Sequence, residues 1–151
     1  MTTALTTAFE TTLTFAAPPE RVFPLLCPVK EYDWIPDWRC TMVHSATGIA
    51  ELGCVFTREG ETWVTTRYEP PTVIEYTIVS PRTAAMLRFA LQAAGETTIA
   101  TVRSTNTALT PAAEEQVRGW TAELQQQLWS MREVEANHYL RTGTILAPAS
   151  S

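Results

Sequence analysis

Positive charge is scarce in this sequence. Its 151 residues contain 11 Lys and Arg against 16 Asp and Glu, which gives a formal net charge of −5. Lys30 is the single lysine, and the arginines are scattered along the chain without forming a run. Because affinity for nucleic acid depends on clustered cations, we expect no nucleic-acid partner.

Long apolar runs and paired cysteines are also lacking. No segment approaches the roughly 20 consecutive apolar residues that span a bilayer, and segment 1–15 has no basic leader of the kind that directs export. The cysteines Cys27, Cys40 and Cys54 are odd in number and lie in apolar or strand-like contexts. We therefore expect a cytoplasmic protein without a membrane span, in which these cysteines are small buried hydrophobic residues.

Motifs of the common catalytic and metal sites are missing as well. The sequence has no G-x-S-x-G, no cysteine–histidine signature of a thiol enzyme and no loop that cradles phosphate. Cys40, Met42 and His44 alternate along one expected strand, and a hairpin would place Cys54 opposite His44. This set lacks C-x-x-C spacing, and a closed structural zinc site takes four ligands. We expect ordinary strand packing here, with no metal and no cofactor.

The chain has the size and composition of one globular domain. With 45% hydrophobic residues, residues 1–151 can bury a core without a metal or a disulfide, and the tail at about 144–151 is expected to be loose. Alternation of apolar and polar residues predicts a first strand over 6–17, followed by two short helices rich in proline. Six further strands are expected at 39–47, 54–60, 62–69, 73–80, 84–92 and 97–107.

A long helix closes the chain. Thr110 can cap it, Pro111 suits its first turn and Gly143 can end it. Over 111–139 it would measure about 40 Å at ~1.5 Å per residue, and it is the one element long enough to cover a face of the sheet. The expected fold class is α+β: a curved, seven-stranded antiparallel sheet that grips a long C-terminal helix, with two short helices after the first strand. A ligand can bind in the space between sheet and helix.

Several phrases of the sequence resemble the START-like, or helix-grip, superfamily, in particular its polyketide cyclase/dehydrase and lipid transport branch. They are APPERVFPLL after the first strand, DWIPDW, RYEPPTVIEYTIVSP in the middle strands and TNTALTP before the last helix. The resemblance covers nearly the whole chain. It implies the fold described above and a shared container whose contents differ from branch to branch, with no catalytic motif common to all members.

Aromatic and apolar side chains are the candidates for lining this cavity. On the last helix one apolar stripe recurs at spacings of three and four, which suits core packing and pocket lining equally. It consists of Val117, Trp120, Leu124, Leu128 and Met131. Together with inward-facing strand residues and the DWIPDW segment, the candidate ligand-binding residues are Trp34, Trp38, Trp63, Arg67, Tyr76, Phe89, Trp120, Leu124, Leu128 and Met131.

Some of these placements depend on geometry that the sequence leaves open. Arg67 would anchor an anionic group at the pocket mouth if it shares the inner face of its strand, but a shift of register by one residue turns it outward. Trp34 and Trp38 are expected to close one end of the cavity near the last helix. Trp129 lies off the helix stripe and is expected to pack on the short helices or on a partner chain, which allows a homodimer.

Glu135 and His138 continue the helix stripe and are the candidate catalytic residues. If the helix still faces the sheet there, the two side chains point into the cavity at i and i+3; otherwise both lie in solvent.

The leading interpretation of the function is binding or transport of a hydrophobic small molecule that is lipid-like or aromatic and polyketide-like. The alternatives are an enzyme of the cyclase or dehydratase type that uses this pair as acid and base, and a protein-interaction module resembling the heat-shock ATPase activators of the same superfamily.

Overall fold

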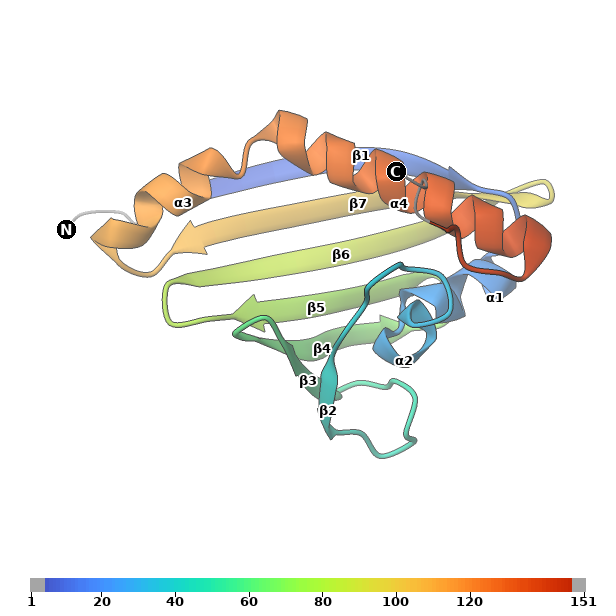
Figure 1. The fold of residues 1–151 in the computed structure, drawn as a ribbon, viewed down its shortest axis with the longest axis horizontal. Helices are drawn as coiled ribbons and strands as arrows, with labels where there is room; N and C mark the ends of the chain where they lie inside the picture. Colours follow the sequence, from blue (N-terminus) through green and yellow to red (C-terminus); the bar gives the residue numbers. More distant parts are fainter. Residues whose placement is uncertain (1–4, 148–151) are drawn as a thin grey trace.

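The computed structural model describes residues 5–147. Seven strands form one antiparallel sheet in the order β1-β7-β6-β5-β4-β3-β2, and the C-terminal helix runs along it near β1 and β7 (Figure 1). The strands are β1 (Thr6–Phe15), β2 (Thr41–His44), β3 (Val55–Arg58), β4 (Glu61–Glu69), β5 (Val73–Val79), β6 (Thr83–Ala94) and β7 (Thr97–Ala108). The helices are α1 (Pro19–Val22), η1 (Phe23–Leu26), α2 (Pro28–Glu31), η2 (Pro111–Ala113), α3 (Glu114–Gly119) and α4 (Ala122–Thr142). This architecture confirms the predicted fold class.

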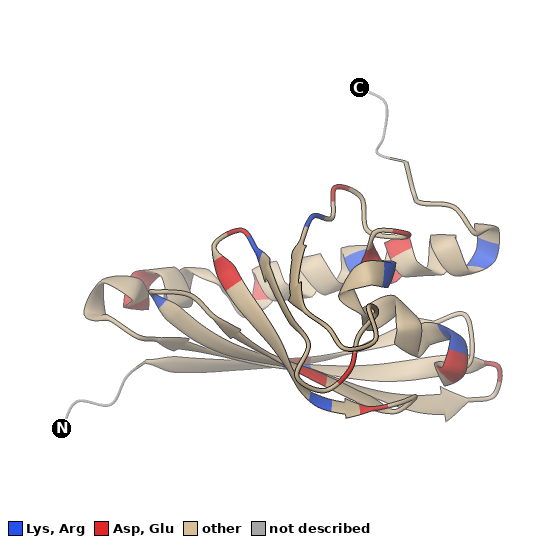
Figure 2. Cartoon of the chain, turned by 90° about the horizontal axis from the view of Figure 1, so that it is seen from below, with Lys and Arg blue, Asp and Glu red and all other residues tan. Residues whose placement is uncertain are grey.

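The inner face of the sheet carries the hydrophobic core. Alternate residues along each central strand are buried, as the period of two in a strand requires. On β6 these are Leu87, Phe89 and Leu91, and on β7 they include Ala100 and Val102. The outer face mixes polar residues with exposed apolar ones such as Val79 and Ile99. In Figure 2 the Lys and Arg segments are interspersed with Asp and Glu segments.

The short helices and the EYDWIPDW segment form one wall, which internal hydrogen bonds hold together. Proline begins α1 and α2, where a missing N–H costs no helical hydrogen bond. Trp34 Nε1 donates to the Leu25 carbonyl at 2.7 Å, and Trp38 Nε1 donates to the Pro28 carbonyl at 3.0 Å. Both indoles are buried, so their polar atoms are satisfied by the backbone of the preceding turns.

The predicted continuous helix over 111–139 is wrong, because the chain breaks between α3 and α4. Trp120 lies outside helical geometry, with ψ of 71°. Thr121 then caps a new helix, since its Oγ1 accepts from the Leu124 backbone N–H at 3.2 Å. Gly143 ends α4 in the left-handed conformation at φ of 73°, as predicted.

The break changes which face of the helix is buried. Because the helix restarts at Thr121, spacings of three and four counted from Trp120 no longer identify residues on one face of α4. Leu124 and Met131 are 44% and 50% exposed, whereas Gln125 and Ala136 are buried. The predicted apolar stripe is therefore correct for Val117 on α3, and wrong for Leu124 and Met131 on α4.

One edge of α4 is bonded to β1. Thr11 Oγ1 donates to Gln126 Oε1 at 2.8 Å, and the Ala16 backbone N–H donates to Asn137 Oδ1 at 2.8 Å. Asn137 Nδ2 returns a bond to the Thr14 carbonyl at 2.9 Å. These bonds satisfy backbone groups on the outer edge of β1 that would otherwise lack a partner. We call this row of contacts the β1–α4 seam.

Arg67 faces outward, because a bulge interrupts β4. Trp63 and Thr65 lie opposite Ile78 and Tyr76, as predicted, but the register shifts between Thr65 and Arg67. A bulge moves every following residue to the other face. Arg67 consequently pairs with Glu69, and its neighbour Tyr68 turns inward and packs edge-on against Phe23 at 5.5 Å.

In the described part of the chain, no helix is long and apolar enough to cross a membrane. Of the tail predicted to be loose, residues 144–147 have no regular secondary structure, and residues 148–151 lie outside the described residues.

Candidate functional site: a pocket between the sheet and the C-terminal helix

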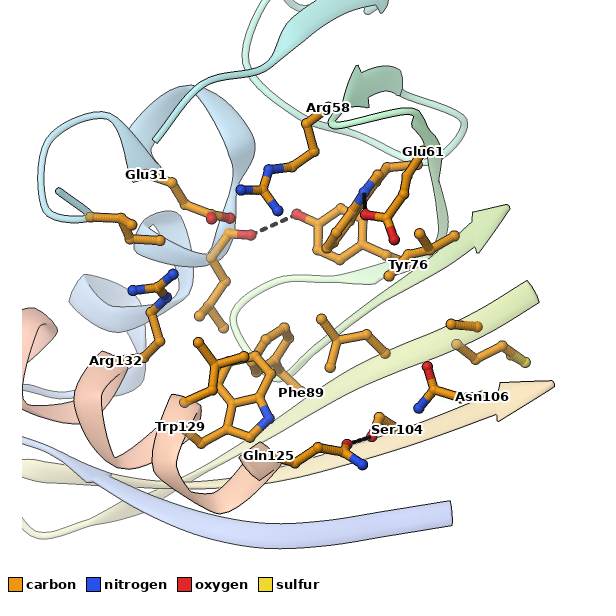
Figure 3. Close-up of a pocket in the computed structure, with 18 of the residues that line it drawn as sticks. Glu31, Arg58, Glu61, Tyr76, Phe89, Ser104, Asn106, Gln125, Trp129 and Arg132 are labelled. Atoms are coloured by element: carbon orange, nitrogen blue, oxygen red, sulfur yellow. Dashed lines mark hydrogen bonds between the residues drawn. The ribbon is translucent and has the colours of Figure 1, made fainter. Parts of the chain in front are cut away.

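A cavity of about 280 Å³ lies between the inner face of the sheet, α4 and the wall formed by the short helices (Figure 3). Of the ten residues predicted to bind a ligand, seven line this cavity: Trp34, Trp38, Trp63, Tyr76, Phe89, Trp120 and Leu128. The other three, Arg67, Leu124 and Met131, do not, because of the β4 bulge and the restart of the helix.

Aromatic rings form the middle of the pocket. Phe89 on β6 packs edge-on against Trp129 on α4, with ring centroids 5.5 Å apart. Across the cavity, Trp63 packs against Tyr76 at the same centroid distance. The Tyr76 hydroxyl donates to the Leu26 carbonyl at 2.6 Å, so it is engaged with the backbone of η1. These rings present flat apolar surfaces to the cavity.

One end of the pocket is charged. Glu31, Arg58 and Arg132 come from α2, β3 and α4, and their head groups point toward one another (Figure 3). Burial raises the pKa of the Glu31 carboxyl well above its usual range, and the charges of Arg132 and then Arg58 offset part of that rise. This carboxyl therefore holds its proton more strongly than an ordinary glutamate does.

The two arginines are held differently. Arg132 Nη1 donates to Glu135 Oε1 at 2.6 Å, so its charge is balanced on α4 itself. The Arg58 guanidinium lies 4.4 Å from the centroid of the Trp38 ring, in cation–π geometry. Arg58 Nε is buried, and no acceptor for it occurs among residues 5–147.

The other end of the pocket is polar. Ser104 Oγ donates to Gln125 Oε1 at 2.8 Å, and Gln125 Nε2 donates to the Trp120 carbonyl at 3.1 Å. The buried Gln125 thus ties the α3–α4 break to β7. A second hollow beside α3 shares four lining residues with the pocket: Glu61, Thr83, Asn106 and Trp120. The pocket therefore continues to the surface beside this break.

Glu135 and His138 are not brought together in the pocket. Glu135 is buried in its ion pair with Arg132, and His138 Nε2 lies 3.4 Å from Thr144 Oγ1. Neither residue lines the cavity. Of the two alternatives left open, placement in the cavity is wrong, because the face that α4 turns to the pocket carries Trp129 and Arg132. Placement in solvent is wrong for Glu135, which is buried.

Several residues that line the pocket were not among the ten candidates, including Glu31, Arg58, Trp129 and Arg132. Arg58 shares strand parity with Phe56, an apolar residue, and that alternation was a usable signal. Trp129 and Arg132 follow from the correct helix phase, and Thr121 with Glu123 behind it is a helix-start signal that would have set this phase. Nothing in the sequence marks Glu31, whose role depends on what packs around it.

The sulfur-containing residues pack together without forming a metal site. Cys54 Sγ lies 3.5 Å from Met42 Sδ, and His44 is exposed. Burial raises the pKa of the Cys27 thiol to about 12, which leaves it a poor nucleophile and metal ligand. Within the described residues, no three His, Cys, Asp or Glu side chains are grouped so that they could hold a metal ion.

The fold and the pocket define a helix-grip protein with a cavity for a hydrophobic ligand. Comparison with known families is more specific: the family model described as "Polyketide cyclase / dehydrase and lipid transport" matches residues 6–134, and the chain belongs to this family. No match to the chain was found among curated proteins.

Solved structures share the fold at low sequence identity. CalU16 from Micromonospora echinospora has a TM-score of 0.55 at 15% identity, over 93% of this chain and 90% of its own. Major latex-like protein 151 from Panax ginseng has a TM-score of 0.60 at 15% identity, over 89% and 98%. A norcoclaurine synthase point mutant from Thalictrum, in complex with a transition-state analogue, has a TM-score of 0.63 at 10% identity, over 95% and 100%.

Proposed function

We propose that this protein binds, and carries, a hydrophobic small molecule in the pocket between its sheet and α4. The observation that supports this most directly is a cavity of about 280 Å³ whose middle is walled by aromatic rings from the sheet, α4 and the short helices. Ligand pockets in proteins are concave, mainly apolar and equipped with a few polar groups. Flat aromatic walls suit a lipid-like or an aromatic, polyketide-like molecule.

Two measurements test this proposal. The protein as purified is denatured and extracted for mass spectrometry, and the refolded protein is titrated with an apolar fluorescent probe. Ala85→Phe fills the pocket from β6, because Ala85 lines it. Ala84→Phe is the matched control, since the neighbouring residue on a strand faces the other side of the sheet.

We expect the probe to bind the unmodified protein and the Ala84→Phe variant, and to lose at least tenfold in affinity for Ala85→Phe. Equal affinity for all three proteins would place the probe outside the pocket. Absence of any binding, together with an empty extract, would end the carrier proposal.

A second candidate function is proton-transfer catalysis of the cyclase or dehydratase type, with Glu31 in place of Glu135 and His138. The observation that favours it is a carboxyl whose pKa is raised by burial at the charged end of the pocket, which makes its ionised form a stronger base than an ordinary carboxylate. Glu31 would take the α-proton of a bound ketone and later return it, and Arg58 would stabilise the enolate that forms in between. The test is hydrogen–deuterium exchange at the α-carbon of a bound aryl ketone, which Glu31→Gln should abolish without abolishing binding.

The interaction-module alternative loses its main support, because Trp129 packs on Phe89 inside the pocket rather than on an exposed patch. A homodimer stays a prediction, and sedimentation equilibrium would test it. The apolar residues on the exposed side of α4, Leu124, Met131 and Val134, are the surface such a dimer would use.

A further inference from the structure

We infer that the ligand carries an oxygen acceptor, a carboxylate or a carbonyl, at one end, and that this end lies at the charged end of the pocket against Arg58. The inference rests on the proposed function and adds the ligand's chemical class and its orientation. It follows from how Arg58 is held, from which neighbouring acceptors are already used, and from the shape of the remaining cavity.

Arg58 presents a donor that is fixed and unused. Stacking on Trp38 holds its guanidinium at the charged end of the pocket (Figure 3). Its ion pair is made through Nη2 to Glu59 at 3.7 Å, and the Glu59 side chain is 76% exposed, so this contact is weak. Nε is buried and has no hydrogen-bond partner within the described chain, and the Arg58 side chain lines the cavity. A buried donor of this kind favours any molecule that brings it an acceptor.

The protein's own acceptors near Arg58 are committed to other partners. Glu61, its cross-strand neighbour, accepts from Trp63 Nε1 at 3.2 Å. Glu135 is paired with Arg132, and the Leu26 carbonyl accepts from Tyr76. Glu31 faces Arg58 across the pocket (Figure 3), but no ion pair joins the two side chains in the described part of the chain. An oxygen placed between these two groups would accept from Arg58.

The remainder of the cavity suits a flat apolar body. Leading away from Arg58, the walls are the rings of Trp63, Phe89 and Trp129, and the path ends at Trp120, where the pocket reaches the surface. A ligand with its oxygen at the inner end would lay its rings or chain along these walls. The reverse orientation would bury hydrocarbon against the Arg58 donor, which leaves that donor unsatisfied.

Carboxylate and carbonyl share this recognition chemistry, and the experiment separates them. We propose three naphthalenes of nearly equal shape: 2-isopropylnaphthalene, 2-acetylnaphthalene and 2-naphthoate. Each is titrated by displacement of the fluorescent probe from the full-length protein and from two variants. Arg58→Met removes the donor and keeps the apolar stem. Arg103→Met is the control, because Arg103 is an exposed arginine on β7 that pairs with Glu10 away from the pocket.

The unmodified protein should bind at least one of the two oxygen-bearing ligands about tenfold more tightly than the isopropyl compound, as expected for a hydrogen bond to a charged donor. Preference for naphthoate identifies a carboxylate ligand, and preference for the acetyl compound identifies a carbonyl. Arg58→Met should reduce that preference to near unity and leave the isopropyl affinity unchanged, whereas Arg103→Met should behave like the unmodified protein.

Equal binding of all three compounds by the unmodified protein, or a preference that persists in Arg58→Met, would overturn this inference while leaving the carrier proposal standing. If none of the compounds displaces the probe and the probe itself does not bind, the carrier proposal fails instead. Should Arg58→Met not fold, Arg58→Lys replaces it. The lysine variant keeps a cation but loses the planar guanidinium, so the preference for the oxygen-bearing ligand should fall, and a preference equal to that of the unmodified protein would overturn the inference.

Discussion

Replacing Glu31 with glutamine should change how the stability of the protein depends on pH. In the folded protein, burial raises the pKa of Glu31 well above its ordinary value of 4.5. Above that pH the unfolded chain loses the proton while the folded protein keeps it, so the free energy of unfolding falls as the pH rises, until the pH passes the folded-state pKa. Glutamine has the same shape and no proton to lose. Glu31→Gln therefore removes this loss.

The slope sets the size of the effect. A group that stays protonated in the folded state alone changes the free energy of unfolding by about 1.4 kcal/mol per pH unit at most. The difference between variant and unmodified protein should be small and constant near pH 4. It should then grow in favour of Glu31→Gln over each pH unit above 4.5, by an amount that approaches this limit.

Urea denaturation followed by tryptophan fluorescence, repeated between about pH 4 and pH 8, measures this difference directly. Titrations of other groups are common to both proteins and largely cancel in the difference; the nearby Cys27 thiol has its pKa raised to about 12 and does not titrate in this range. Glu96→Gln, in the exposed turn between β6 and β7, serves as the control. Curves for Glu31→Gln and unmodified protein that run parallel over the whole range would refute the reasoning.

Two further predictions concern buried hydrogen bonds. Tyr76→Phe leaves the buried Leu26 carbonyl without its donor and should lower the free energy of unfolding by about 1–3 kcal/mol in urea denaturation; an unchanged midpoint would contradict it. Gln125→Leu removes the bonds to Ser104 and to the Trp120 carbonyl. It should cost a similar ~1–3 kcal/mol and speed hydrogen exchange of the Trp120 amide, whereas the exposed neighbour Gln127→Leu should do neither.

Local rules were enough to predict most of the fold from sequence. Period-two alternation predicted the first strand, the spacing of turns predicted the six that follow, and Thr110, Pro111 and Gly143 predicted where the last helical region begins and ends. The errors came from single residues that reset a period. Thr121 restarts the helix, and the bulge after Thr65 reverses the faces of β4. Each error moved a predicted pocket residue, Met131 or Arg67, to the outside.

The charged end of the pocket could not be predicted from sequence in the same way. Glu31, Arg58 and Arg132 lie far apart along the chain and meet only when α2, β3 and α4 pack around one cavity. Their chemistry depends on desolvation and on each other's charge, and neither quantity is encoded in any local pattern. Glu135 illustrates the opposite case. Its position on the helix suggested a site residue, but its charge is balanced by Arg132, one turn away.

The β1–α4 seam fixes one long side of the helix through Thr11, Thr14 and Ala16. On the pocket side, the Gln125–Ser104 bond joins the start of α4 to β7, and further along the helix Trp129 meets Phe89 through ring packing. A ligand that enters between these two rings would therefore displace an aromatic contact and leave the seam bonds in place.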